Sequence, residues 1–388
     1  IQRAALIRYD ANGDSLWLRE YGDSTEEWIG RQAKQTPDGG YILTGETWNG
    51  TDLDGFLIKT DAQGNEEWTQ LYGGVTQDYL ASVDVLPTGG YVAGGFRKIG
   101  GTNQMWVIRV SDFGAVVWQQ VFGSPFDDAN ALITTLDDGS IAVASGWGYA
   151  NGGASLRSYL ARLDSNSGSL IWSDQYGSIT PDALLFAVKQ CSDGTLIAAG
   201  NTNHGGYYKG SLLRAGLNGD SIWMYYFQYY DTLMSDGRGS FRDVLQTLDG
   251  GFIACGLAHS SFSGNDPPGY TQDVWVIKVD SLGCLEPGCN LVSIHTQVTN
   301  FRNALSLWPN PVSETLTVAW DLPEGLRCGN SCQLSVVSAA GQLVRTETIR
   351  LATGQHQLDV RYLSPGLYHV HLVQDGTWVT GGKFLRAP

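Results

Sequence analysis

The stretch from Asp38 to Gly73, DGGYILTGETWNGTDLDGFLIKTDAQGNEEWTQLYG, decides the fold of this 388-residue chain. It combines an Asp-Gly turn, short apolar runs and a tryptophan that is followed four residues later by Tyr-Gly. Counterparts of this tryptophan, Trp68, stand at Trp17, Trp118, Trp172 and Trp223. The pattern therefore returns every 50 to 54 residues, and a fixed period of this length is typical of a solenoid or a propeller.

Each copy of the pattern predicts four short strands separated by turns. The first strand ends at a pair such as Asp38-Gly39, which supplies the positive φ angle that a hairpin needs. The second stops at a glycine such as Gly45, the third carries a basic residue such as Lys59, and the fourth carries the tryptophan. No segment keeps a 3.6-residue apolar period, so helix is minor. We predict an all-β fold, a β-propeller of about 50-residue four-stranded blades followed by a small β-sandwich; a stacked β-solenoid is the alternative.

The chain opens on a third strand, so we expect it to begin inside a blade. Five to six blades are visible in the sequence, and two ways of closing the ring follow. Five blades would use Leu16–Tyr21 as the last fourth strand. Six would leave the first blade without two strands and would use Leu291–Gln297 as the last strand. We favour six.

Composition narrows the range of partners. The chain has 24 basic and 39 acidic residues and a net charge of −15, which disfavours nucleic acid and anionic membranes as partners. Charged residues make up only 16% of the chain, whereas glycine (50) and tryptophan (13) are frequent, as suits an extracellular all-β protein. No apolar run is long enough to predict a transmembrane segment.

Four of the six cysteines form two closely spaced pairs. We predict disulfides between Cys284 and Cys289 and between Cys328 and Cys332, because each pair encloses turn residues and suits an oxidising compartment. A zinc site is the alternative, but neither pair has further ligands at finger spacing. Cys191 and Cys255 stand in apolar strand contexts and are expected to be buried thiols.

The repeat stops near Cys289, and about seven short alternating strands in the last part of the chain predict a β-sandwich. This part contains four short motifs in order: Pro309-Asn310-Pro311, Gly341, Leu363-Ser364-Pro365-Gly366-Leu367-Tyr368 and Lys383-Phe384-Leu385. With these motifs, residues 303–388 resemble the C-terminal sorting domain of type IX secretion cargo from Bacteroidota. The repeat region resembles glycine- and tryptophan-rich repeat proteins found upstream of such domains.

The resemblance implies export across the outer membrane, recognition of residues 303–388 by the type IX translocon, and often removal of the domain with attachment to surface lipopolysaccharide. We therefore predict a secreted or outer-membrane-attached cell-surface protein. Its expected domains are a propeller at 1–290, a linker at 291–302 and the sorting domain at 303–388. The sorting residues to examine are Pro309, Asn310, Pro311, Gly341, Gly366, Tyr368 and Lys383.

Residues that recur in every copy are best explained by the blade itself. The tryptophans could be sugar-stacking platforms, but recurrence at one strand position favours packing between neighbouring blades. The basic residues of the third strands and an acidic residue five positions after the fourth-strand glycine could form an anion-binding ring. We favour structural ion pairs or turn caps. The residues concerned are Arg8, Lys59, Arg109, Arg162, Arg214 and Lys278, with Glu27, Asp78, Asp128 and Asp182.

The loops between second and third strands differ from copy to copy, and variable loops on a rigid scaffold commonly hold binding sites. Their aromatic residues suit glycan or protein ligands, although these rings could instead only cover blade edges. The candidate ligand-binding residues are Trp48, Phe96, Trp147, Tyr149, Tyr207, Tyr208, Phe262 and Tyr270. Asp52 and Asp54 could hold calcium, but their loop does not match a calcium motif, and we favour an ordinary exposed turn.

No motif of a hydrolase or metalloenzyme is present, so we predict no enzyme activity and no cofactor other than the calcium considered above. The predicted function is adhesion, with a glycan or protein ligand bound by the propeller loops. A structural protein that self-assembles on the cell surface is the alternative. A glycan-active enzyme is a third hypothesis, because a propeller could bring distant carboxylates together.

Overall fold

The computed structural model describes residues 2–48, 50–150, 154–177, 182–204, 207–229, 238–259, 273–285, 296–299, 305–320, 332–339, 342–349, 354–374 and 377–388. These residues form strands and turns and contain no helix, as the sequence predicts. Two compact units divide the chain. Unit 1 is Ile1–Ala198 with Ala215–Asp220, and unit 2 is Ala199–Arg214 with Ser221–Pro388.

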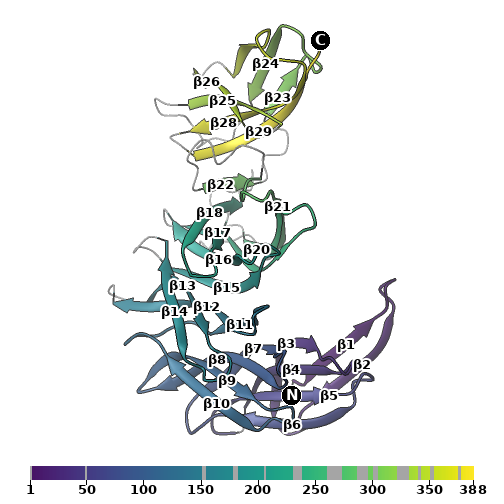
Figure 1. The fold of residues 1–388 in the computed structure, drawn as a ribbon, viewed down its shortest axis with the longest axis vertical. Helices are drawn as coiled ribbons and strands as arrows, with labels where there is room; N and C mark the ends of the chain where they lie inside the picture. The colour runs from purple at the N-terminus through teal and green to yellow at the C-terminus, as the bar shows by residue number, and fades with distance from the viewer. Residues whose placement is uncertain are drawn as a thin grey trace, which may run out of the picture. The chain divides into compact units, whose positions relative to one another are not determined.

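Unit 1 consists of antiparallel sheets whose strands follow the chain in order. Its strands are β1 (Ala4–Tyr9), β2 (Ser15–Tyr21), β3 (Glu27–Gln35), β4 (Tyr41–Trp48), β5 (Leu53–Thr60), β6 (Glu66–Tyr72), β7 (Asp78–Val85), β8 (Tyr91–Ile99), β9 (Thr102–Val110), β10 (Val116–Phe122), β11 (Leu132–Thr135), β12 (Ile141–Ala150), β13 (Ala154–Leu163), β14 (Leu170–Tyr176) and β15 (Ala183–Gln190). β3–β6, β7–β10 and β11–β14 each form a four-stranded sheet, whereas β1 and β2 form a separate pair (Figure 1). The predicted four-stranded units are therefore present, and the closed ring of a propeller stays a prediction.

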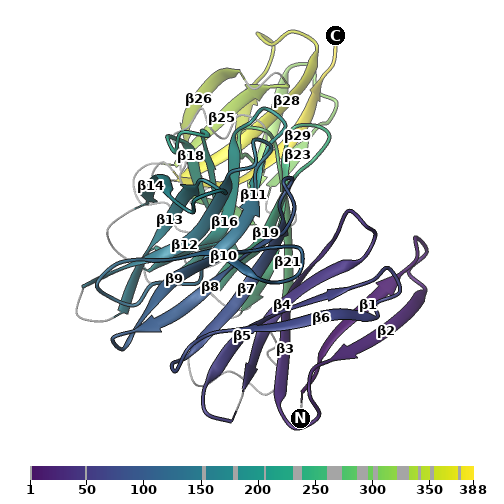
Figure 2. The ribbon, with the colours of Figure 1, turned by 60° about the horizontal axis from the view of Figure 1, so that its bottom comes forward.

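The cores of unit 1 lie between successive sheets, as in the one between the β3–β6 and β7–β10 sheets. Leu57 of β5 lies in one cluster with Leu80 of β7 and Trp106 of β9, and all three side chains are fully or almost fully buried. The second and third strands are nearly continuous apolar runs because both of their faces are covered. Figure 2 shows the strands of each sheet side by side.

The recurring aromatic residues of the fourth strands bind the hairpin turn of the next sheet. Trp68 Nε1 donates to the Asp112 carbonyl at 3.0 Å, and Tyr72 Oη donates to the Gly114 carbonyl at 2.7 Å. Gly114 has a φ of 80° and would bring a Cβ within 3.1 Å of the Trp68 ring, so glycine is required there. Equivalent bonds run from Trp118 Nε1 to the Ser165 carbonyl and from Trp172 Nε1 to the Leu217 carbonyl. The packing interpretation of these tryptophans is confirmed.

The basic residues of the third strands are structural as well. Lys59 Nζ contacts Asp38 and Glu67, each at 2.8 Å, and the lysine side chain is almost fully buried. Arg162 pairs in the same way with Asp138, the turn aspartate of its own sheet. Each ion pair connects a third strand to the Asp-Gly turn beside it. Lys59 and Arg162 therefore have a structural role.

Unit 2 contains the last repeats and the C-terminal sandwich. Its strands are β16 (Leu196–His204), β17 (Tyr207–Ala215), β18 (Ser221–Tyr229), β19 (Arg238–Gln246), β20 (Phe252–His259), β21 (Asp273–Val279), β22 (Thr296–Thr299), β23 (Leu305–Trp308), β24 (Thr315–Trp320), β25 (Cys332–Ser338), β26 (Leu343–Ile349), β27 (Gln355–Asp359), β28 (Gly366–Gln374) and β29 (Thr377–Arg386). The three-stranded sheet β23-β24-β27 packs against β26-β25-β28-β29 around one apolar core. This arrangement is the β-sandwich that the sequence predicts.

The two strands considered for ring closure pair elsewhere. Leu16–Tyr21 lies in β2 and pairs with β1. Most of Leu291–Gln297 lies outside the described residues, and its described end belongs to β22, which pairs in parallel with β18. Among the described strands, β19, β20 and β21 form a sheet of three. The described end of this segment, Thr296 and Gln297, is therefore not part of that sheet.

The cysteines agree with the sequence in part. Cys284 and Cys332 are each disulfide-bonded. Their predicted partners Cys289 and Cys328 lie outside the described residues, so the pairings stay predictions. Cys191 is buried as expected, but Cys255 is exposed. That prediction was wrong because Cys255 lies on the outward face of β20, where successive side chains alternate between faces.

Candidate ligand-binding site

Trp48 is the last residue of β4 and the one candidate aromatic of unit 1 that is largely exposed, with 41% of its surface accessible. Its direct partner across the β3–β4 pair is Glu27. Residues directly opposite in an antiparallel pair lie on the same face of the sheet. The indole and this carboxylate are therefore neighbours, although 21 positions separate them in the sequence.

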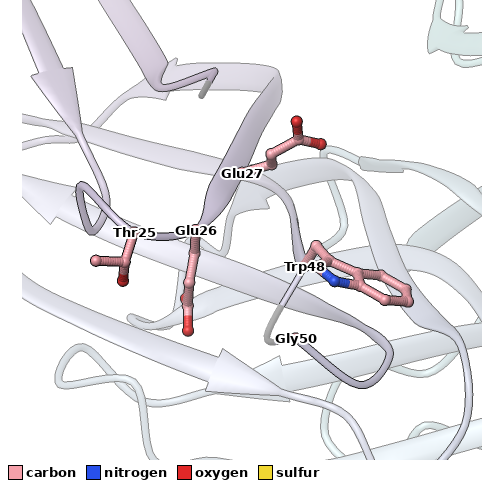
Figure 3. A pocket seen from close by; sticks show the side chains of 5 residues that line it. All are labelled: Thr25, Glu26, Glu27, Trp48 and Gly50. Atoms are coloured by element: carbon pink, nitrogen blue, oxygen red, sulfur yellow. The ribbon is translucent and has the colours of Figure 1, made fainter.

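A hollow of about 670 Å³ opens beside this pair (Figure 3). It is lined by Thr25, Glu26, Glu27, Trp48 and Gly50. The described lining includes two carboxylates and no basic side chain. One wall is thus a flat aromatic ring, and the others are oxygen-rich, which suits a ligand that has an apolar face and hydroxyl groups.

The hollow exists because the repeat is altered at this place. The bulge of β3 falls between Gly30 and Gln32, and that of β7 falls between Leu80 and Ser82. Counted back from each bulge, Trp28 stands where Asp78 stands in the next sheet. Trp28 stands six residues after Gly22, whereas Asp78 stands five residues after Gly73. The sequence alignment of Glu27 with Asp78 was therefore wrong by one position.

Asp78 shows the structural role of this position in the β7–β10 sheet. Its carboxylate is fully buried, accepts from Arg97 Nε at 3.2 Å and accepts from the backbone of Lys98 at 3.2 Å. In the β3–β6 sheet the buried place is filled by the Trp28 ring, which contacts Phe56 at a centroid distance of 5.0 Å. Glu27 is left on the outer face beside Trp48 and has no such structural role.

The two carboxylates of the hollow do not face each other. Glu26 and Glu27 are consecutive residues entering a strand, where successive side chains point to opposite sides. Figure 3 shows them directed apart, with Glu27 upward and Glu26 downward in this view. The arrangement offers separate acceptors for ligand hydroxyls. It does not resemble a pair of acids placed on either side of one bond.

The other candidate aromatics of unit 1 do not line this hollow. Phe96 makes an edge contact with Tyr79 at 4.5 Å, and Trp147 packs on Tyr159 at 5.0 Å against an apolar cluster. Tyr149 is half-buried on the same strand as Trp147. The ring contacts of Phe96 and Trp147 are with residues of the sheets. A role in ligand binding stays a prediction for these residues.

The remaining candidates belong to unit 2. Tyr208 is half-buried and lines a separate hollow within unit 2. The side chain of Tyr207 and the residues Phe262 and Tyr270 lie outside what the structure describes. Sequence reasoning missed Thr25, Glu26 and Glu27 as lining residues, because the shift that turns Trp28 inward is visible only from the bulge of β3.

The calcium hypothesis gains no support from the described part of the chain. No three His, Cys, Asp or Glu side chains of those residues gather as metal ligands. Asp52 is buried, and the Asp54 carboxylate lies directly over Gly73, where a Cβ would come within 1.8 Å of its Oδ1. Asp54 therefore packs against the end of its own sheet.

The predicted sorting motifs come together at one edge of the sandwich. The Asn310 side chain donates to the Lys383 carbonyl at 3.0 Å and accepts from the Leu385 backbone at 2.9 Å. The Tyr368 ring stacks on Phe384 at 5.6 Å, and its hydroxyl donates to the Ser364 carbonyl at 3.0 Å. The motifs thus join the first turn of the domain to its last strand.

The neighbouring motif residues complete this edge. Both prolines of the turn, Pro309 and Pro311, follow cis peptide bonds. Gly366 begins β28 and pairs with Arg386, near the end of β29. Gly341 lies outside the described residues.

Comparison with known proteins bears directly on this domain. Residues 306–385 match the family described as "Secretion system C-terminal sorting domain". The sorting domain predicted from the motifs is confirmed. The protein is cargo of type IX secretion and is secreted or attached to the outer-membrane surface. Its described residues form no helix long and apolar enough to cross a membrane.

The sequence has no significant match among the curated proteins. Similar solved structures include a protein of unknown function from Dyadobacter fermentans, with 12% identity, TM-score 0.40 and coverage of 77% of this chain and 92% of that one. A thermostable family-43 glycoside hydrolase has 12% identity, TM-score 0.38 and coverage of 65% and 89%. An extracellular domain from B. thetaiotaomicron has 12% identity, TM-score 0.23 and coverage of 98% and 62%. These scores are too low to carry an argument.

Proposed function

We propose that this protein is a cell-surface adhesin that binds a neutral glycan in the hollow beside Trp48. The observation that carries the proposal is the pairing of Trp48 with Glu27 on one exposed face. A sugar ring presents a face of C–H groups that packs on an indole, and its hydroxyls donate to carboxylates. The four-stranded sheets would form a propeller that holds this site rigidly.

The departure from the repeat supports a binding role for this place. The β7–β10 sheet uses the position that corresponds to Trp28 for a buried carboxylate, that of Asp78. In the β3–β6 sheet, Trp28 fills the buried position, so the outward residue Glu27 has no such structural role. The exposed indole beside two carboxylates makes no evident contribution to folding stability. A side chain that stays exposed removes little apolar surface from water when the chain folds. A ligand accounts for the arrangement.

We propose binding without catalysis at this site. Hydrolysis of a glycosidic bond usually requires two carboxyl groups on either side of that bond. Glu26 and Glu27 point apart in Figure 3, and the hollow is open. These features support recognition of a glycan that remains intact.

The test is a glycan array probed with the full-length protein and with Trp48→Ala. We expect binding to neutral glycans that falls at least about tenfold in the variant, which corresponds to about 1.4 kcal/mol. Phe113→Ala is the matched control, since Phe113 is an exposed aromatic of the same unit that does not line the hollow. Equal binding by Trp48→Ala and wild type would contradict the proposal.

A further inference from the structure

The charge around the hollow beside Trp48 has one sign. Glu27 is exposed, Glu26 is half-buried, and both line the hollow. Within the part of the chain that the structure describes, neither carboxylate forms a hydrogen bond or an ion pair. Two uncompensated negative charges therefore border the space that a ligand would fill (Figure 3).

The neighbouring strand shows a carboxylate that the fold does neutralise. Glu46 lies on β4, two positions before Trp48, and is almost fully buried. It accepts two hydrogen bonds from the guanidinium of Arg31, which balances its charge. The described lining of the hollow contains no basic side chain that could do the same for Glu26 or Glu27.

Thr25 adds an acceptor to the same lining. Its hydroxyl donates to Asp23 Oδ1 at 2.6 Å, and its backbone N–H donates to the same oxygen at 2.7 Å. These hydrogen bonds hold the pKa of Asp23 below its ordinary value, so Asp23 is charged and can only accept. Because the Thr25 hydroxyl has already donated its proton, it offers a ligand its lone pairs.

Arg3 is the basic residue that acts on Asp23, but it is engaged elsewhere. Its guanidinium donates to the Gly22 carbonyl at 2.9 Å and lies 3.9 Å from the Glu20 carboxylate. It does not line the hollow. The charge of Glu26 and Glu27 is therefore not offset by this arginine.

The Trp48 indole favours the same sign of ligand charge as the carboxylates do. Its ring is 41% exposed and lines the hollow. The face of an indole is the negative part of its quadrupole, and it attracts a cation within about 6 Å of the ring centroid. The ring and the two carboxylates together favour a positive group on the ligand and disfavour a negative one.

We propose that the hollow ranks glycans by charge. A sugar that carries an ammonium group binds more tightly than its neutral counterpart, and the corresponding acidic sugar binds most weakly. Glu26 and Glu27 set this order, because each attracts an ammonium group and repels a carboxylate. The inference rests on the glycan site proposed above and adds the charge of the ligand as a determinant of specificity.

The test uses methyl glycosides that differ only at C6, which carries an ammonium, a hydroxyl or a carboxylate group. Each is prepared in the gluco, galacto and manno configurations, and binding to the full-length protein is measured by ligand-observed NMR titration. We expect the ammonium form to bind at least about threefold more tightly than the neutral form, and the carboxylate form at least about threefold more weakly. Raising the salt concentration from about 0.05 M to about 0.5 M should shrink both differences.

Glu26→Gln tests the source of this order. It should reduce the ratio between the affinities of the ammonium and carboxylate forms at least about threefold. Glu66→Gln is the matched control, because Glu66 is an exposed glutamate at the start of β6 that does not line the hollow. That control should leave the ratio unchanged.

The outcomes separate this inference from the glycan site itself. Equal affinities of the three forms, or a ratio that neither salt nor Glu26→Gln alters, would overturn the charge order. If Trp48→Ala still weakened the binding of every form, the glycan site would stand. No binding of any form overturns the charge order and, together with an array that is negative for neutral glycans, the glycan site as well.

Discussion

Glu27 and Trp48 are direct partners across the β3–β4 pair, so an exposed indole and a carboxylate share one face at the end of the sheet. The next cross-strand pair, Trp28 and Thr47, points inward, and both residues are almost fully buried. Successive side chains of β3 and β4 therefore alternate between two roles. Inward residues build the core, and outward residues form the wall of the hollow.

Replacing Glu27 by glutamine should weaken glycan binding less than Trp48→Ala does. Glutamine keeps one acceptor but loses the charge, and charge-assisted hydrogen bonds are roughly twice as strong as neutral ones. We expect a loss of about 3- to 10-fold in affinity, measured by calorimetry with a glycan identified on the array. Glu20→Gln is the control, as an exposed glutamate of unit 1 outside the lining. A larger effect of Glu20→Gln would contradict the assignment.

Gly168→Ala should destabilise unit 1 more than Gly139→Ala does. Both glycines have positive φ angles, 69° and 81°, so alanine costs about 1–2 kcal/mol of backbone strain at either place. Only at Gly168 would the added Cβ come within 2.8 Å of the Trp118 ring, whereas Gly139 has open space. Overpacking should add about 1–3 kcal/mol at Gly168. Urea unfolding followed by tryptophan fluorescence gives the comparison, and equal midpoints would contradict the role of Trp118.

The Asp38–Lys59 pair should make stability depend on pH in the acid range. The hydrogen bond from Lys59 lowers the pKa of Asp38 to about 2, with help from Thr36. Because the folded pKa lies below the ordinary value of 3.8, the contribution of Asp38 is fully present above about pH 4 and is lost as pH falls toward about 2. Asp38→Asn should therefore be less stable than wild type near neutrality, and this difference should shrink toward pH 2.

The control for this pair is a double-mutant cycle. In a Lys59→Met background the partner of Asp38 is absent, so Asp38→Asn should change the pH profile much less. Unfolding midpoints in urea across the same pH range provide the measurement. A difference between Asp38→Asn and wild type that stays constant down to about pH 2 would rule out the linkage.

Asn310→Ala should impair export of the protein. It removes both hydrogen bonds from the Asn310 side chain to the terminal strand, at Lys383 and Leu385. We expect the sandwich to lose about 1–2 kcal/mol of stability, at about 1 kcal/mol per bond. Secretion by a type IX-competent host should fall, measured as protein outside the cell against protein retained inside. Gln342→Ala is the control, since only the backbone of Gln342 bonds to Ser338. Normal secretion of a destabilised Asn310→Ala would mean that this edge is not read during export.

Much of the fold could be predicted because its determinants are local. Turns such as Asp38-Gly39 fix hairpins through the conformation of two residues, and apolar second and third strands report burial on both faces. The tryptophans were correctly interpreted as packing residues because they recur at one strand position. The sorting motifs were found for a similar reason, because Asn310 and Lys383 belong to short segments with characteristic sequences.

The candidate site could be predicted only in part. Trp48 stood out because it breaks the repeat, whereas Glu27 looked like a member of it. Glu27 stands one position before Trp28, the residue that corresponds to Asp78. A shift of one residue exchanges the inward and outward faces of a strand. Counting along the sequence cannot detect this exchange, but the position of the bulge in β3 reveals it.

The sequence by itself determined the repeated four-stranded units, the sandwich at the end of the chain and the export route, because periodicity, turn chemistry and short motifs are properties of neighbouring residues. Only the tertiary structure decided which side chains meet. It placed Glu27 beside Trp48, and it turned Trp28 inward onto Phe56. These meetings depend on strand register and on bulges, which are fixed by pairing between distant segments. The chemistry of the hollow beside Trp48 therefore lies in cross-strand relationships that one strand alone does not contain.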